Sequence, residues 1–156
     1  MTGDATFSRD RRYRYRLWRR WDHTRPVVVF VLLNPSTADA RHDDPTIRRC
    51  LGFARRWGYG GIEVVNVFAY RATNPRVLRT LRDPVGRANR YHVRVALAHA
   101  ALVVLAWDAS TEGDRMIKVS RAHCLGLTSA GQPRHPLYLR RDVRPVPYPA
   151  LPAGAA

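Results

Sequence analysis

The chain has 156 residues and a mass of 17.8 kDa, which suits one compact domain with its own apolar core that needs no disulfide or metal to stabilise it. Its 27 basic residues outnumber 12 acidic ones, and the formal net charge of +15 is typical of proteins that bind polyanions such as nucleic acids. Cys50 and Cys124 are the only cysteines, and no apolar run approaches the roughly 18 residues of a membrane helix, so we expect a cytoplasmic protein without a disulfide framework or a membrane anchor.

The first elements in chain order are a flexible segment and two strands. Residues 1–10 are expected to be flexible, and the single domain to span residues 11–142. In "RRYRYRLWRRW" the arginines alternate with Tyr13, Tyr15 and Leu17, a period of two that predicts a half-buried strand whose arginine face, with Arg14, is solvated. The continuous apolar run at 27–33 predicts a central strand covered on both faces.

The second half alternates helices with strands. Asp44 followed by Pro45 is a typical helix opening, with aspartate as N-cap and proline in the first turn. The expected elements are a helix at 45–58, a strand at 62–70, a helix at 86–100, a strand at 101–107, a helix at 113–122 and a strand at 123–129. The Pro- and Ala-rich tail at 143–156 is expected to be disordered.

This alternation predicts the fold class and the position of the site. We expect an α/β fold, a three-layer α/β/α sandwich with a four-stranded, mainly parallel sheet and an N-terminal antiparallel strand. In such sheets ligands bind beyond the carboxyl ends of the strands. A polar residue lies late in, or after, each predicted parallel strand: Asn34, Asn66, Asp108 and His135.

Several candidate residues also have a purely structural interpretation. Asn34 is also typical of a turn that closes a strand. Asn66, flanked by valines, needs partners for its whole amide, either from a neighbouring loop or from a base. Asp39, Asp43 and Asp44 together are a candidate divalent-metal site, but helix capping accounts for Asp44 and the helix N-terminus favours Asp43. Asp39 is the acid that capping explains least.

Four short motifs carry a family resemblance. In order, "LLNPS", "VVNVFAY", "VVLAWD" and "RHPLYL" resemble the strand ends of the uracil-DNA glycosylase superfamily, with Leu32 where that superfamily usually has glycine. More closely, "LNPSTAD", "DPTIRRC", "VNVFAYRAT" and "RHPLYL" resemble the bacterial family of unknown function DUF1643, over residues 11–142.

The glycosylase resemblance implies a uracil-DNA-glycosylase-like fold and three principal site residues. Asn34 matches the residue that orients the attacking water, and Asn66 the residue that pairs with the base. His135 matches the residue that stabilises charge on the departing base. The resemblance requires no metal and no organic cofactor.

Further positions complete the predicted site. Asp39 is assigned to assist the water, while Phe68 and Tyr70, with Phe53 as an alternative, are candidates for stacking on the base. Contacts to the DNA backbone are assigned to Ser36, Thr37, Arg71 and Arg134.

The sequence therefore predicts a monomeric hydrolase that cleaves an N-glycosidic bond. The favoured substrate is a damaged or modified base in DNA rather than RNA, in repair or base modification, with a free nucleotide as the alternative. Two other functions stay open. One is a non-catalytic basic module that recognises a nucleotide or modified base, and the other is a metal-dependent nuclease using Asp39, Asp43 and Asp44.

Overall fold

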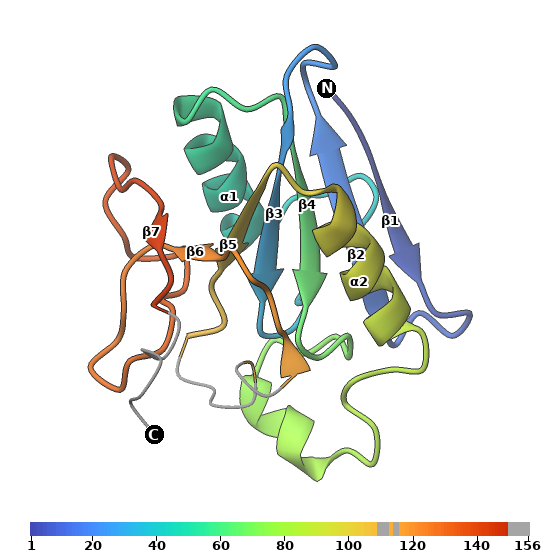
Figure 1. The fold of residues 1–156 in the computed structure, drawn as a ribbon. Helices are drawn as coiled ribbons and strands as arrows, with labels where there is room; N and C mark the ends of the chain where they lie inside the picture. Colours follow the sequence, from blue (N-terminus) through green and yellow to red (C-terminus); the bar gives the residue numbers. More distant parts are fainter. Residues whose placement is uncertain (109–112, 114–115, 150–156) are drawn as a thin grey trace.

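The computed structural model describes residues 1–108, 113 and 116–149 (Figure 1). Its elements are β1 (Thr2–Phe7), β2 (Arg14–Arg20), β3 (Val27–Leu32), α1 (Pro45–Arg56), β4 (Gly61–Asn66), the 3₁₀ helix η1 (Pro75–Thr80), α2 (Asn89–His99), β5 (Leu102–Leu105), β6 (His123–Cys124) and β7 (Val146–Pro147). Within the described part of the chain, no helix is both long and apolar enough to cross a membrane.

The strands form one mixed sheet in the order β1-β2-β4-β3-β5-β6-β7. The middle strands β4, β3, β5 and β6 run parallel, while β1, β2 and β7 pair antiparallel with their neighbours. The predicted α/β class is confirmed, and so is an antiparallel strand that precedes the parallel ones in the chain. Because β3 to β6 are parallel, the loops that follow them leave from one edge of the sheet, here called the carboxyl edge.

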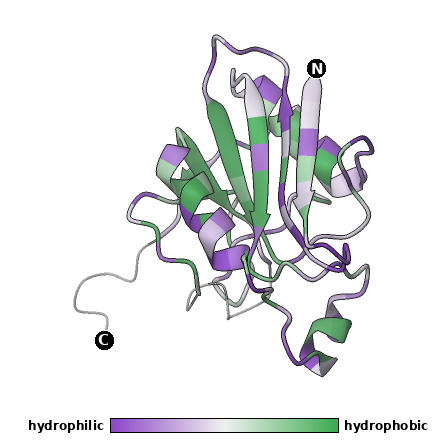
Figure 2. Ribbon diagram, turned by 90° about the vertical axis from the view of Figure 1, so that its right-hand side faces the viewer, coloured by the Kyte–Doolittle hydropathy of each residue, from purple (hydrophilic) through white to green (hydrophobic). Residues whose placement is uncertain are grey.

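The apolar run of β3 is explained by two cores, one on each face of the sheet. Val28, Phe30 and Leu32 pack in the cluster that contains the buried face of α1. The alternate residues, Val29 and Val31, pack in the cluster that contains α2. Figure 1 shows the two helices on different sides of the central strands, and Figure 2 shows the hydrophobic residues concentrated in those strands. A strand buried on both faces needs apolar residues at every position.

Helix α1 begins where the sequence predicts. The Asp44 side chain accepts a hydrogen bond from the Ile47 backbone N–H at 2.9 Å, and Pro45 is the first helical residue. The cap satisfies one of the free N–H groups of the first turn. At the other end Gly58 takes a φ of +84°, a conformation that glycine adopts without steric cost.

The solvated arginine face predicted for the first strand is wrong at Arg14. The register of β1 with β2 runs from Thr6 opposite Arg16 to Phe7 opposite Arg14, so Tyr15 is an extra residue in a bulge. Beyond a bulge the side chains exchange faces. Arg14 is consequently only 1% exposed, and its guanidinium donates to the Ala38 carbonyl at 3.0 Å.

Both chain ends differ from the prediction of flexible segments. Residues 2–7 form β1, paired antiparallel with β2, and residues 146–147 form β7, paired with β6. A strand at the edge of a sheet gains its hydrogen bonds from its neighbour, which outweighs weak local propensity. Residues 150–156 of the predicted tail lie outside the described residues.

Two predicted elements near the C-terminus are shorter in the structure. The strand expected at 123–129 is limited to β6, after which Leu127 forms an isolated bridge with Pro133. In the helix expected at 113–122, residues 114 and 115 lie outside the described part, and residues 117–122 are not helical. After β6 the chain turns at Gly126 and Gly131, which both have a positive φ, and does not continue as a strand.

Candidate functional site

The loops at the carboxyl edge are tied to one another by backbone hydrogen bonds. The loop after β3 is joined to the loop after β4 by the Ala72 N–H, which donates to the Pro35 carbonyl at 2.9 Å. The loop after β5 is joined to the loop after β6 by the Asp108 N–H, which donates to the Pro133 carbonyl at 2.8 Å. One tie therefore fixes the loops after β3 and β4 to each other, and the other fixes the loops after β5 and β6.

Asn34 is partly buried, and its side chain is held in place. Its Nδ2 donates to the Ala72 carbonyl at 2.7 Å and to the Pro35 carbonyl at 3.0 Å. Both amide hydrogens are therefore used to hold the loops together. Among the described residues, Oδ1 receives no hydrogen bond, so this atom is left to accept one from a water or a ligand.

Asn66, the last residue of β4, has no exposed surface. Neither its Nδ2 nor its Oδ1 has a hydrogen-bond partner in the described part of the chain. Its neighbour Asn89, at the start of α2, donates to the carbonyls of Asn66 and Val67 at 2.9 and 3.1 Å, so the backbone there is satisfied while the Asn66 amide is not. Buried polar groups are rarely left unpaired, which makes Asn66 a candidate ligand-reading residue.

His135 is held in one tautomer by the backbone. Its Nδ1 accepts a hydrogen bond from the Leu137 N–H at 3.1 Å, so the ring hydrogen of the neutral form lies on Nε2. Burial lowers the pKa of His135 below its ordinary value, while the Asp108 and Asp44 carboxylates act in the opposite direction. Near neutral pH the imidazole is therefore an uncharged donor.

A hollow of about 420 Å³ surrounds His135. Asp108, Arg134 and Tyr138 also line it, and Arg134 is held by a hydrogen bond from its Nε to the Leu127 carbonyl at 2.9 Å. Tyr138 is 97% exposed and has a φ of +68°, a strained conformation for a residue with a side chain. Tyr138 was not among the predicted site residues; an aromatic directly after "HPL" is the signal that points to it.

A second hollow, of about 330 Å³, gathers most of the predicted DNA contacts. Ser36, Thr37, Tyr70 and Arg71 line it, whereas Arg134 lines the hollow around His135. Tyr70 is half-buried, with its ring edge-on to Tyr13 at 5.5 Å.

The other aromatic candidates lie in the core. Phe68 is 5% exposed and packs on the α2 side of the sheet, while Phe53 is 2% exposed and packs on the α1 side. Of the three aromatics considered for stacking, only Tyr70 has a ring with appreciable exposed surface.

The three aspartates of the predicted metal cluster have structural partners. Asp44 caps α1 and accepts a second hydrogen bond from the Ala38 N–H at 3.2 Å, and Asp43 pairs with the buried Arg19 at 2.9 Å. The Asp39 carboxylate accepts the N–H groups of Arg41 and His42, each at 2.8 Å. These two bonds, with the His42 ring, lower the pKa of Asp39 to about 2.

Within the described ranges, no group of three or more His, Cys, Asp or Glu side chains is arranged to hold a metal ion. An acid with a pKa near 2 is also a weak proton acceptor at neutral pH. The structure thus accounts for all three aspartates through turns, caps and an ion pair.

The family model of the DUF1643 proteins, described as proteins of unknown function, matches residues 14–137. The chain belongs to the DUF1643 family. The matched region contains Asn34, Asn66 and His135, while β1 and Tyr138 lie outside it. No curated protein and no solved structure matches the chain. The DUF1643 match agrees with the closer of the two resemblances seen in the motifs.

Proposed function

We propose that this DUF1643 protein hydrolyses the N-glycosidic bond of a damaged or modified base in DNA. One observation carries the proposal: the clamped amide of Asn34. Because both of its N–H groups are committed to backbone carbonyls, its Oδ1 is held as a fixed acceptor at the carboxyl edge. An acceptor of this kind binds one hydrogen of a water and turns the oxygen lone pair toward a substrate carbon.

In the proposed reaction the water oxygen bonds to C1′ while the bond from C1′ to the base nitrogen breaks. The transition state resembles an oxocarbenium ion, as in other glycoside hydrolyses. The bonding electrons leave with the base, which takes a hydrogen bond and then a proton, and the attacking water loses a proton to solvent. His135 supports this step because its Nε2–H is the donor of a neutral imidazole.

Base recognition is assigned to Asn66. One amide offers a donor and an acceptor side by side, which matches the amide edge of a pyrimidine. Because Asn66 has no exposed surface, a base reaches it only after local opening of its surroundings. Flipping a base from the stack costs a few kcal/mol, and stacking on the half-buried ring of Tyr70 or the exposed ring of Tyr138 would offset part of this cost.

The finer features of the fold belong to the same proposal. The positions of α1 and α2 on different faces of the sheet support a three-layer α/β/α sandwich of the uracil-DNA-glycosylase kind. In this proposal the protein is a cytoplasmic monomer. It acts in DNA repair or base modification and needs neither a metal nor an organic cofactor.

A second candidate function is recognition without catalysis, and Asp39 favours it. This carboxylate was the predicted helper of the water, but its turn hydrogen bonds and its pKa of about 2 make it a poor base. In this alternative, the residues at the carboxyl edge bind a modified base and release it unchanged.

An excision assay separates these functions. Oligonucleotides carrying uracil, hypoxanthine, oxidised or hypermodified bases are incubated with the protein, with and without EDTA, and analysed for abasic sites. The proposal expects abasic sites that form in EDTA, that disappear with Asn34→Ala and that persist with Asn74→Ala, an asparagine in a neighbouring exposed loop. Binding that survives Asn34→Ala, with no product from any substrate, would favour recognition. EDTA-sensitive strand scission would overturn both in favour of a nuclease.

A further inference from the structure

The 330 Å³ hollow, here called the basic hollow, lies where the β1–β2 connection meets the loops after β3 and β4. Three arginines and four hydroxyl side chains line it: Arg11, Arg12, Arg71, Ser36, Thr37, Tyr70 and Thr73. None of the described residues that line it is acidic. Guanidinium and hydroxyl groups are the side chains that most often hydrogen-bond phosphate oxygens.

Arg71 is positioned by weak contacts that leave donors available. Its Nε donates to the Ser36 carbonyl at 3.5 Å and its Nη1 to the Arg11 carbonyl at 3.4 Å. Its guanidinium lies 4.9 Å from the centre of the Phe7 ring, and that of Arg11 lies 4.1 Å from the same ring. Both guanidinium groups therefore lie against the same aromatic ring, so the two positive charges of Arg11 and Arg71 are close to each other.

Little negative charge offsets these arginines. Asp10 lies 3.9 Å from Arg12, but the two side chains are 57% and 72% exposed, so their attraction is weak. Arg14 adds positive charge in the interior, where its Nε has no partner in the described part of the chain. Burial is the main cause that lowers the pKa of Arg14 to about 10; Asp44 opposes the shift, while the neighbouring Arg71 and Arg19 contribute to it. An anion in the basic hollow would relieve this repulsion.

We propose that the basic hollow binds a backbone phosphate diester, so that the substrate is a polynucleotide and not a free nucleoside or nucleotide. The hollow is wide open to solvent, which suits one phosphate of a passing strand and not an enclosed small molecule. It also shares Ala72 with the Asn34 clamp, so a phosphate bound there brings its strand beside Asn34. The choice of a nucleic-acid strand rests on the proposed function, whereas phosphate binding itself does not.

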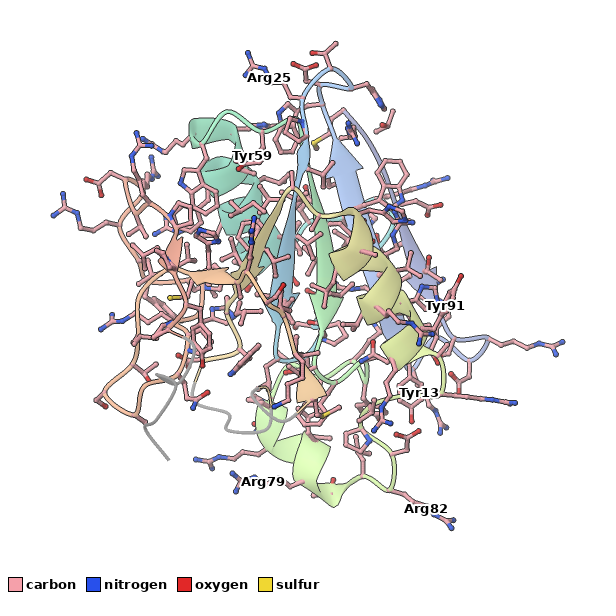
Figure 3. All side chains as sticks on the ribbon, viewed as in Figure 1. Tyr13, Arg25, Tyr59, Arg79, Arg82 and Tyr91 are labelled. Carbon is pink, nitrogen blue, oxygen red and sulfur yellow. The ribbon has the colours of Figure 1, made fainter. Side chains whose placement is uncertain are left out.

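The test is the salt dependence of binding to undamaged single-stranded and duplex oligonucleotides, followed by fluorescence anisotropy. The variants are Arg12→Gln and Arg71→Gln, with Arg25→Gln as a control that removes the same charge. Figure 3 shows Arg25 at the end of the molecule opposite Tyr13, whose ring contacts Tyr70. Urea midpoints check that each variant is folded.

Each hollow variant should bind roughly tenfold more weakly at low salt, because a charge-assisted hydrogen bond to phosphate is lost. The slope of log K against log salt should fall by about 0.7–0.9, as for the loss of one phosphate contact. Arg25→Gln should keep the wild-type slope. Equal losses in all three variants would overturn the proposal. The proposal would also be overturned if a deoxynucleoside monophosphate or inorganic phosphate displaced the labelled oligonucleotide at the same concentration as an unlabelled oligonucleotide.

The same preparations separate this inference from the proposed function. If the wild type releases no base from any substrate but its salt slope depends on Arg71, the phosphate site stands and the glycosylase proposal fails. If base is released and the slopes of Arg12→Gln and Arg71→Gln match that of Arg25→Gln, the glycosylase proposal stands and the phosphate site fails.

Discussion

Replacing Asn66 by leucine should stabilise the protein while abolishing base recognition. The Asn66 amide has two fully buried atoms without partners in the described part of the chain, and each such atom costs about 1–3 kcal/mol. Leucine has a similar shape and removes both. Its two methyl groups are bulkier than the amide oxygen and nitrogen that they replace, and fitting them into a packed core costs about 1 kcal/mol or more. The expected net gain is about 1 kcal/mol in the free energy of unfolding, or roughly 2–4 °C in Tm for a chain of this length.

Urea unfolding of Asn66→Leu, with Asn89→Leu as the matched variant, checks this prediction. Asn89 is also buried, and its Oδ1 likewise has no partner in the described part of the chain. Its Nδ2, however, makes two hydrogen bonds to backbone carbonyls, and the loss of both should cost its leucine variant about 1–2 kcal/mol. The two variants should therefore move the urea midpoint in opposite directions with unchanged m-values. If Asn66→Leu loses as much stability as Asn89→Leu, the Asn66 amide is partnered in the native state and is not reserved for a ligand.

Three further predictions follow from the site. The pKa of His135 is lower in the folded than in the unfolded protein, so the free energy of unfolding should fall as the pH drops below about 6.5. His135→Gln should reduce this fall, measured by urea titrations at pH 7 and pH 5. An unchanged pH dependence in the variant would contradict the prediction. Asp44→Ala removes the α1 cap and the partner of the Ala38 N–H, so it should lower the free energy of unfolding, measured with urea, by about 2 kcal/mol. A loss below a few tenths of a kcal/mol would show that the cap does not stabilise the helix. Tyr138→Ala should leave the free energy of unfolding within about 0.5 kcal/mol but slow excision from duplex more than from single-stranded DNA; equal effects on both substrates would refute a role in base flipping.

Much of the fold follows from local patterns in the sequence. The uninterrupted apolar run of β3 indicates a strand covered on both faces, and its two cores bear this out. Asp44 and Pro45 mark the start of α1 because capping is a local interaction. The predicted exposure of Arg14 is wrong because the bulge at Tyr15 depends on how β2 pairs with β1. The alternation of residues within β2 does not reveal that pairing. The edge strands β1 and β7 were missed for the same reason.

The position of the candidate residues in the fold was more predictable than their contacts. The parallel order of β3 to β6 brings the loops that carry Asn34 and His135 to one edge, as strand alternation implies. The partner of Asn34 is Ala72, 38 residues away, and no local pattern identifies such a contact. The engagement of Asp39 in its own turn and the exposure of Tyr138 likewise depend on loop geometry.

The most direct measurement is the single-turnover rate at which free base is released from a modified oligonucleotide, quantified by mass spectrometry for the wild type and Asn34→Ala. The proposal predicts stoichiometric free base and abasic sites from the wild type, and a rate about a hundredfold lower in the variant, because the water is no longer oriented. Urea midpoints guard against a folding defect from the lost contacts to Pro35 and Ala72. Release at the wild-type rate by folded Asn34→Ala, or no free base from any substrate, would contradict the account.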